Sequence, residues 1–293
     1  MPNRKLLISL LVALGLCSVA APVAGQALIP HTLQLDAEQL EQQGLMLAEE
    51  AAQLARFQQF ELALPRAELA TQLAPNNPQA WAILGSLYLQ AQDLERGVNA
   101  LQRARTLDPE NPAVWFALGS AYFQQQEYQT AIEQLKEGLT LKPDVPGALF
   151  DLGNAYYMLE EYGEAIAAYE KAIEQDEQFW PAINNIGLVK YEQGDVDKAI
   201  ERWKTAAQID ADAAEPQLAI AVAMYAQGKR EQALARGEEA LRLDPRYADL
   251  DFLKENLWGD RLLADTRKFL ATPRMQATLA QLQDAPAPVN RAP

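Results

Sequence analysis

Histidine and cysteine, which often supply bases, nucleophiles and metal ligands, are almost missing from this sequence. His31 is the only histidine and Cys17 the only cysteine among 293 residues. A structural zinc site takes roughly four such ligands, and a Ser-His-Asp arrangement would have to use His31. That residue lies in a segment expected to be a linker. We therefore predict no catalytic residue, no metal site and no cofactor.

Carboxylates are abundant but show no catalytic arrangement. Asp and Glu total 40 against 25 Lys and Arg, so the net charge is −15. They fall mainly on predicted solvent faces and turns, and no spacing singles out an acid of raised pKa beside a base. We predict that the chain is not an enzyme. An acidic surface repels nucleic acid and anionic membranes, so we expect a protein or peptide partner with an apolar or basic segment. The charge alternatively serves only solubility.

The first residues have the layout of a secretory signal peptide. Arg4 and Lys5 precede an uncharged stretch from Leu6 to Ala24, and Gly25 offers a small residue for cleavage. We predict a signal peptide at 1–25. An uncleaved anchor and lipidation at Cys17 are the alternatives. In each case Arg4 and Lys5 stay inside, so the chain is expected in the periplasm or an equivalent extracytoplasmic space, free or anchored to the membrane.

A period of 34 residues runs through the middle of the chain. Trp81 and Trp115 are one period apart. Other columns hold an aliphatic residue, a glycine, a small residue, a large apolar residue and a closing proline: Leu84, Leu118, Leu152 and Ile186; Gly85, Gly119, Gly153 and Gly187; Gly97, Ala131, Ala165, Ala199 and Ala233; Leu101, Leu135, Tyr169 and Trp203; Pro109, Pro143 and Pro245.

The columns predict two packed helices in each period. Apolar residues three and four apart give each helix one buried face. Small residues recur where two helix backbones cross closely, because larger side chains would overpack the contact. Proline stands where the second helix has to end. Because one hairpin cannot bury its apolar face alone, neighbouring hairpins have to stack.

These residues resemble the tetratricopeptide repeat (TPR) family, whose Trp-Leu-Gly-Tyr-Ala-Ala-Pro pattern is almost complete in the units that start at Pro78 and Pro112. The resemblance implies an all-α, right-handed superhelical solenoid of about six TPR hairpins. The units are 44–77, 78–111, 112–145, 146–179, 180–213 and 214–247. The terminal units depart from the pattern, as expected for ends. Glu177 and Ala211 replace closing prolines, so those turns are expected to be looser.

The flanks are predicted to close the array. Residues 26–43 read as a linker and a leading helix capped by Asp36. Residues 248–283 read as C-terminal capping helices, and 284–293 as a disordered tail. Trp258 and Phe269 are too apolar for a pure cap. They are expected either to cover the last repeat or to form a docking or dimer surface.

The TPR resemblance also implies a binding site. In that family the first helix of each unit lines a concave groove. Recurring aromatic rings on this face would form an apolar patch, and asparagines would grip an extended peptide. Alternatively, the rings pack against neighbouring helices. The predicted partner-binding residues are Phe116, Phe123, Phe150, Asn154, Tyr157, Asn184, Tyr191 and Tyr225.

The expected function is an extracytoplasmic scaffold that aids the assembly or stability of exported or membrane protein complexes. One alternative is a self-associating adaptor that uses the C-terminal helices. A second alternative is a membrane-anchored photosystem-assembly factor, because the leader and the Leu253–Leu270 segment have a slight similarity to cyanobacterial and chloroplast TPR proteins. That similarity makes the thylakoid lumen a further possible location.

Overall fold

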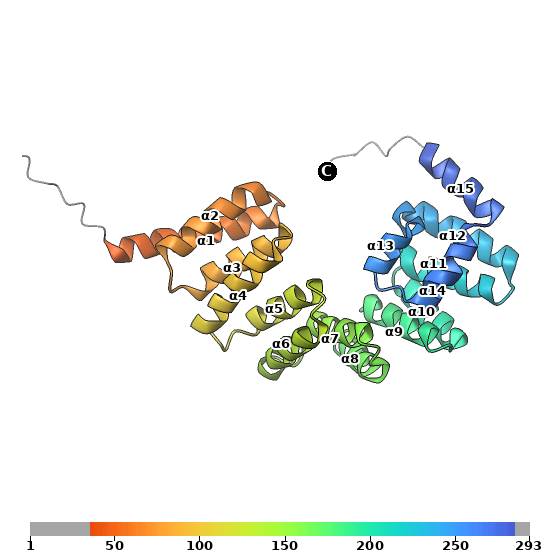
Figure 1. The fold of residues 1–293 in the computed structure, drawn as a ribbon, viewed down its shortest axis with the longest axis horizontal. Coiled ribbons are helices and arrows are strands. Elements are labelled where there is room, and N and C mark those ends of the chain that lie inside the picture. The colour runs from red at the N-terminus through yellow and green to blue at the C-terminus, as the bar shows by residue number, and fades with distance from the viewer. Residues whose placement is uncertain (1–35, 285–293) are drawn as a thin grey trace, which may run out of the picture. The chain divides into compact units, whose positions relative to one another are not determined.

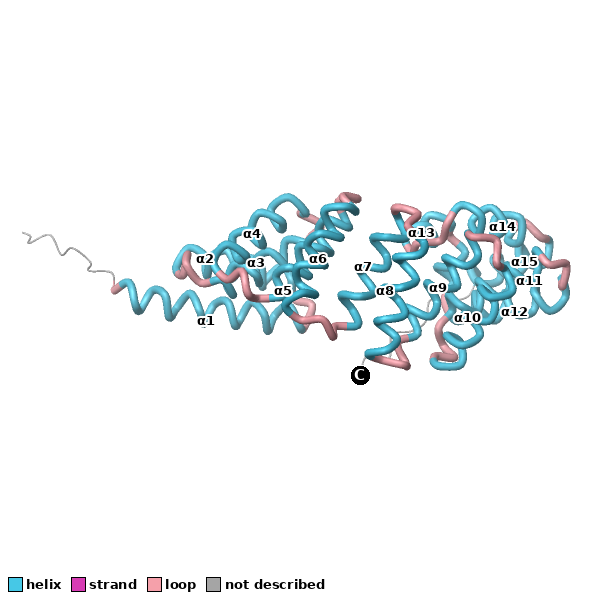
Figure 2. Tube along the Cα trace, turned by 90° about the horizontal axis from the view of Figure 1, so that it is seen from below, coloured by secondary structure: helices cyan, strands magenta, loops and turns pink. Residues whose placement is uncertain are grey.

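A computed structural model describes residues 36–284, which contain fifteen α-helices, one 3-10 helix and no strand (Figures 1 and 2). The predicted signal peptide, most of the predicted linker and the predicted tail after Asp284 lie outside the described residues, as do Cys17 and His31. No helix in the described part is long and apolar enough to span a membrane.

The first twelve helices form six hairpins in chain order (Figure 1). The first helices of the hairpins begin at Pro78, Pro112, Pro146, Trp180 and Ala214, the starts predicted for units two to six. The leading helix and the first helix of unit one are a single helix. The hairpins are α1 (Ala37–Arg56) with α2 (Phe60–Leu73), α3 (Pro78–Gln90) with α4 (Leu94–Leu107), α5 (Pro112–Gln124) with α6 (Tyr128–Leu141), α7 (Pro146–Met158) with α8 (Tyr162–Gln175), α9 (Trp180–Glu192) with α10 (Val196–Ile209), and α11 (Ala214–Ala226) with α12 (Arg230–Leu243).

A glycine in the first helix makes room for a large side chain of the second helix. A Cβ atom at Gly85 would overlap the side chain of Leu101, and one at Gly187 would overlap the indole of Trp203. Gly119 and Gly153 meet Leu135 and Tyr169 in the same way: all four large side chains are fully buried. The predicted close crossing is confirmed, and it sets how near the two helices of a hairpin lie.

Each turn between paired helices holds one residue in the left-handed region. These residues are one period apart: Gln58, Gln92, Gln126 and Glu160 have φ between 58° and 62°, and Gly194 and Gly228 have φ of 88° and 84°. The left-handed conformation costs an L-residue about 1–2 kcal/mol, whereas glycine adopts it freely. The last two hairpins therefore carry the better turn residue.

A hydrogen bond ties the start of several units to the preceding turn. The Nε1 atom of Trp81 donates to the carbonyl of Pro75 at 2.9 Å, and that of Trp115 donates to Pro109 at 2.8 Å. In the sixth unit the Nε2 atom of Gln217 donates to the carbonyl of Ala211 at 2.7 Å. In the sixth unit Gln217 therefore stands at the tryptophan position and makes the equivalent hydrogen bond.

The turns without a closing proline are held by aspartates. The side chain of Asp176 accepts from the backbone N–H of Gln178 at 3.0 Å, and that of Asp210 accepts from Asp212 at 3.0 Å. Such short side-chain bonds fix a turn locally. The expectation of looser turns overlooked these two aspartates.

The C-terminal segment consists of η1 (Pro245–Ala248), α13 (Leu250–Glu255), α14 (Asp260–Leu270) and α15 (Pro273–Asp284). Helix α14 packs against α9 and α11, the first helices of the fifth and sixth hairpins, and α15 packs against α12. The segment therefore covers more than the last repeat. Trp258 and Phe269 are 2% and 0% exposed. The alternative that they form a dimer surface is wrong, because the chain's own helices bury them.

Phe269 fills a space that the sixth hairpin leaves open. One period after Trp203 the second helix has Gly237 in place of a large side chain. A Cβ atom there would overlap the ring of Phe269, which also packs edge-on against Tyr225 with ring centres 5.5 Å apart. Helix α14 thus supplies to the sixth hairpin a large side chain of the kind that hairpins two to five supply themselves.

We expect Gly228→Ala to lower the free energy of unfolding by about 1 kcal/mol, because alanine resists the left-handed conformation. Nothing lies within 4 Å of the added methyl group, so packing does not contribute. Gly163→Ala is the matched control: it is equally open but is the second residue of α8, outside the left-handed region, where alanine should stabilise by about 0.5 kcal/mol or less. Urea unfolding would measure both, and effects of the same sign would contradict the assignment.

Candidate partner-binding groove

The first helices of neighbouring hairpins contact one another from α3 to α9, and their side chains form one continuous surface, here called the first-helix face. The predicted binding residues all lie on these helices. Three parts of the face differ in chemistry: an open part on α1, α3 and α5, an aromatic part on α5 and α7, and a part on α9 and α11 that α14 covers.

The open part contains a hollow of about 500 Å³, here called the N-terminal hollow. Small side chains line much of it, and a second hollow of about 550 Å³ adjoins it and shares Ala52, Arg56 and Gln79. Among the residues that line the N-terminal hollow, Arg56 alone is charged. The lining residues are Ala52, Ala55, Arg56, Phe60, Gln79, Ala82, Ile83, Ser86, Leu87, Gln90, Leu101, Asn111, Ala113, Val114 and Ala117.

The three predicted phenylalanines are half-buried by rings and helices of the chain itself. The ring of Phe123 lies 5.3 Å from Tyr128, and Phe150 packs edge-on against Phe179 at 5.5 Å. Phe116 lies over Gly138, where an added Cβ atom would overlap its ring. These rings mainly pack the array and offer only part of their surface to a partner.

The predicted asparagines are buried and bond to other side chains of the protein. Oδ1 of Asn154 accepts from the Tyr169 hydroxyl at 2.8 Å and from Nδ2 of Asn185 at 2.9 Å. Asn184 donates to Asn185 at 3.1 Å, and its backbone carbonyl accepts from Trp203 at 3.1 Å. The expectation that Asn154 and Asn184 grip an extended peptide is wrong for this conformation, because their amides lie inside the array.

Two carboxyl groups lie near this asparagine cluster, on α7 and α11. Burial raises the pKa of Asp151, which accepts a 3.0 Å hydrogen bond from the Ser120 hydroxyl. Burial raises the pKa of Glu215 to about 7, although hydrogen bonds from Asn184, Trp258 and Tyr247 lower it. The Trp258 bond measures 3.1 Å. The carboxyl of Glu215 therefore fixes the residues before α14 to the first-helix face.

The N-terminus of α14 is held by Glu192. Its carboxylate accepts from the backbone N–H groups of Arg261 and Leu262 at 3.1 and 3.0 Å. A carboxylate is favoured there because the first N–H groups of a helix have no partner within the helix. One turn further along α14, Oδ2 of Asp265 accepts from the Tyr191 hydroxyl at 2.8 Å. The guanidinium of Arg261 lies 5.2 Å from the centre of the Tyr191 ring.

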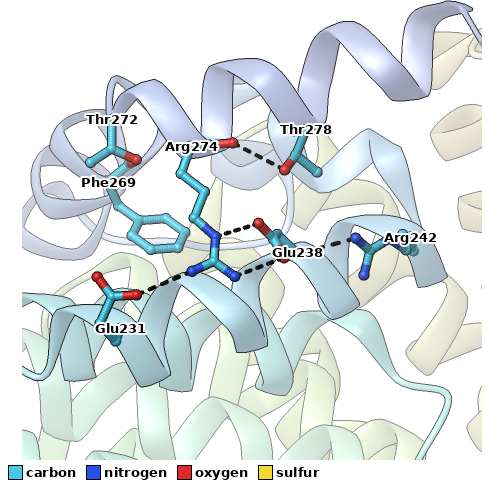
Figure 3. Close-up of polar contacts among 7 residues, drawn as sticks. All are labelled: Glu231, Glu238, Arg242, Phe269, Thr272, Arg274 and Thr278. Atoms are coloured by element: carbon cyan, nitrogen blue, oxygen red, sulfur yellow. Dashed lines mark hydrogen bonds and ion pairs between the residues drawn. The ribbon is translucent and has the colours of Figure 1, made fainter.

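Helix α15 is tied to α12 by Arg274 (Figure 3). Its guanidinium donates to both carboxylate oxygens of Glu238, at 2.6 and 3.1 Å, and to Glu231 at 3.3 Å. The backbone carbonyl of Arg274 accepts from the Thr278 hydroxyl at 3.1 Å. A two-pronged arginine–carboxylate pair fixes orientation as well as distance. Glu192 therefore holds the N-terminus of α14 against α9, and Arg274 holds α15 against α12.

The predicted residues divide into two groups. Asn154, Tyr157, Asn184 and Tyr191 are buried, so the expectation that they line an open groove is wrong in this structure. Burial raises the pKa of Tyr157, whose hydroxyl has no hydrogen-bond partner among the described residues. Half-buried positions are Phe116, Phe123, Phe150 and Tyr225.

None of the eight predicted residues lines the N-terminal hollow. Sequence reasoning selected large rings and asparagines, whereas the hollow is lined by small side chains of the first two units, Ala52 on α1 and Ala82 and Ser86 on α3. Ala52, Ala82 and Ser86 were the signal that could have found it. In the part of the chain that the structure describes, no group of His, Cys, Asp and Glu is placed to hold a metal ion.

Comparison with known proteins decides the family. A family model described as a tetratricopeptide repeat matches residues 45–112, 84–146 and 116–178, and another described as a TPR repeat matches residues 187–228. The chain belongs to the tetratricopeptide repeat family. The TPR fold is typically a non-enzymatic scaffold, and its general role in protein–protein interaction is the role that the family match supports for this chain.

Solved structures show the same TPR fold. A crystal structure of MamA is 26% identical with a TM-score of 0.52, and the match covers 59% of this chain and 94% of that chain. The pilF protein of Pseudomonas aeruginosa is 17% identical with a TM-score of 0.61, covering 75% and 98%. YrrB, described as a TPR protein with an unusual peptide-binding site, is 18% identical with a TM-score of 0.50, covering 69% and 97%. The comparison with curated proteins gave no match.

We expect the protein to lose stability as pH rises from about 4.5 to about 7, because folded Glu215 keeps its proton to higher pH than the unfolded chain does. Below this pH range the Glu215 carboxyl is protonated in both the folded and the unfolded chain. Above it the carboxyl is ionised in both, and the free energy of unfolding is lower by about 3 kcal/mol. Urea unfolding at pH 4.5 and pH 8 would measure it. Other groups also titrate, so the quantity that tests Glu215 is the difference between wild type and Glu215→Gln. A difference that stays constant with pH would show that Glu215 isn't the group responsible.

Proposed function

We propose that this TPR protein binds an apolar peptide or protein segment on its first-helix face, at the N-terminal hollow, and thereby supports the assembly or stability of exported or membrane protein complexes. The observation that carries the proposal is an apolar hollow of about 500 Å³ on a face whose other end is already covered by α14. Large exposed apolar surface is costly to keep and commonly marks an interaction site.

The chemistry of the lining supports binding and offers no catalysis. Arg56 is the only titratable side chain on the lining of the N-terminal hollow, so no acid and base face each other there. Glu215 and Asp151 have raised pKa values, but Glu215 is enclosed by its own hydrogen-bond partners and Asp151 bonds to Ser120. A binding role without catalysis is the function that these contacts support.

The proposed location is the periplasm or an equivalent extracytoplasmic space. It rests on the basic, then apolar, then small-residue order at the N-terminus of the sequence. Alkaline phosphatase fused after Pro293 is active only outside the bacterial cytoplasm, because its disulfides form there. An inactive, protease-protected fusion would place the protein inside and remove this part of the proposal.

We expect Ser86→Trp to abolish binding of the physiological partner, because Ser86 is exposed on the floor of the hollow and an indole would fill it. The matched control is Ala235→Trp, an exposed alanine on the second helix α12. Affinity capture from membranes and periplasm of the native host, with both variants and wild type, would measure this. Partners retained equally by all three folded proteins would exclude the hollow as their site.

A further inference from the structure

We infer that the N-terminal hollow binds an amphipathic α-helix of a partner protein, with bulky apolar side chains along one face and a carboxylate placed against Arg56. The inference rests on the proposed function and names the form of the ligand. Four features of the described residues support it: the way α14 uses the same face, the shape of the hollow, the state of its polar groups, and its charge.

The chain itself shows what the first-helix face can accept. Helix α14 lies on α9 and α11 and buries the side chains of Leu262, Thr266 and Phe269, all 0% exposed. The three residues are four and three positions apart, so they form one stripe of a helix. A helix with an apolar stripe is therefore a ligand that this face already holds, two hairpins beyond the hollow.

The hollow is lined by side chains that are smaller than those at the equivalent positions of other units. At one position of the first helix the second unit has Ala82 where later units have Phe116 and Phe150, and four residues on it has Ser86 where the fourth unit has Asn154. The missing volume has to come from the guest. Large side chains at one-turn spacing on a helix suit a hollow that extends over three first helices, and each buried ring contributes roughly 150–250 Å² of contact.

The polar groups on the floor of the hollow favour a helix over an extended chain. The hydroxyl of Ser86 donates to the carbonyl of Ala82 at 2.9 Å, and Oδ1 of Asn111 accepts from the N–H of Ala113 at 3.1 Å. An extended peptide needs partners for its backbone N–H and C=O groups, whereas a helix pairs its own. The Ser86 hydroxyl and the Asn111 Oδ1 are already engaged, and the uncharged side chains left to pair with a guest are mainly the exposed amides of Gln79 and Gln90. A guest with a self-sufficient backbone fits better because it does not need a row of partners along its length.

The charge of Arg56 determines which end of the bound helix should carry an acidic residue. Arg56 is exposed, stands where the two adjoining hollows meet, and makes no salt bridge within residues 36–284. The nearest acid on the lining, Glu49 in the second hollow, is two turns away on α1. A guanidinium pairs best with a carboxylate. The local preference is thus for an acidic residue, although the net charge of the whole chain favours basic partners.

Two peptide libraries displayed on phage and selected against the purified full chain would test the inference. Both carry Leu, Ile, Phe or Met at helical spacing and mixtures of Glu, Lys and Gln elsewhere, and the second has two central prolines that prevent a helix. We expect enrichment from the first library only, with Glu near one end. Selection against Arg56→Glu should replace that Glu by Lys. Enriched peptides, measured by fluorescence anisotropy, should bind Ser86→Trp at least tenfold more weakly than Ala235→Trp.

The outcomes separate the two proposals. Proline-containing binders that are lost on Ser86→Trp would overturn the helix and leave the binding hollow in place. Helical binders that are indifferent to Arg56→Glu would overturn the charge assignment. If neither library yields a binder sensitive to Ser86→Trp, while circular dichroism shows the variant folded, both the inference and the proposed binding site fall.

Discussion

The close crossing of two helices at a glycine is the contact on which the rest of the array depends. At Gly85, Gly119, Gly153 and Gly187 the first helix has no Cβ atom, and a large side chain of the second helix occupies that space. The crossing fixes the distance between paired helices, and the 34-residue period copies it along the chain. Stacking then follows because each hairpin has apolar surface left to bury.

The two ends of the array differ in how their apolar surface is covered. At the C-terminal end, α14 lies on the first helices of the fifth and sixth hairpins and α15 covers α12, so the apolar surface there is buried by the chain itself. At the other end, α1, α3 and α5 leave a hollow of about 500 Å³. The first-helix face therefore has an open part with a hollow, an aromatic part whose rings are half-buried, and a part that the chain's own C-terminal helices cover.

Sequence alone predicted the helices and their pairing, because the columns of small and large residues record local geometry directly. It expected four of the eight binding residues on an open face where the structure buries them, and there is a physical reason for the difference. Nothing in the period of Asn184 or Tyr191 shows that Asp265 or Trp258, many residues later, folds back over that part of the face. The alanines of the open hollow are not among the predicted binding residues, because a small side chain marks a close helix contact and an empty space equally well.

The borrowed ring of Phe269 has a consequence for how the protein is made. Hairpins two to five each contain both the glycine and the large side chain of their crossing, so each of these crossings can form from the residues of its own hairpin. The sixth hairpin has Gly237 at the decisive position and has to wait until α14 arrives. During synthesis the sixth hairpin therefore stays incomplete after its own two helices have been made, until the residues of α14 have followed them.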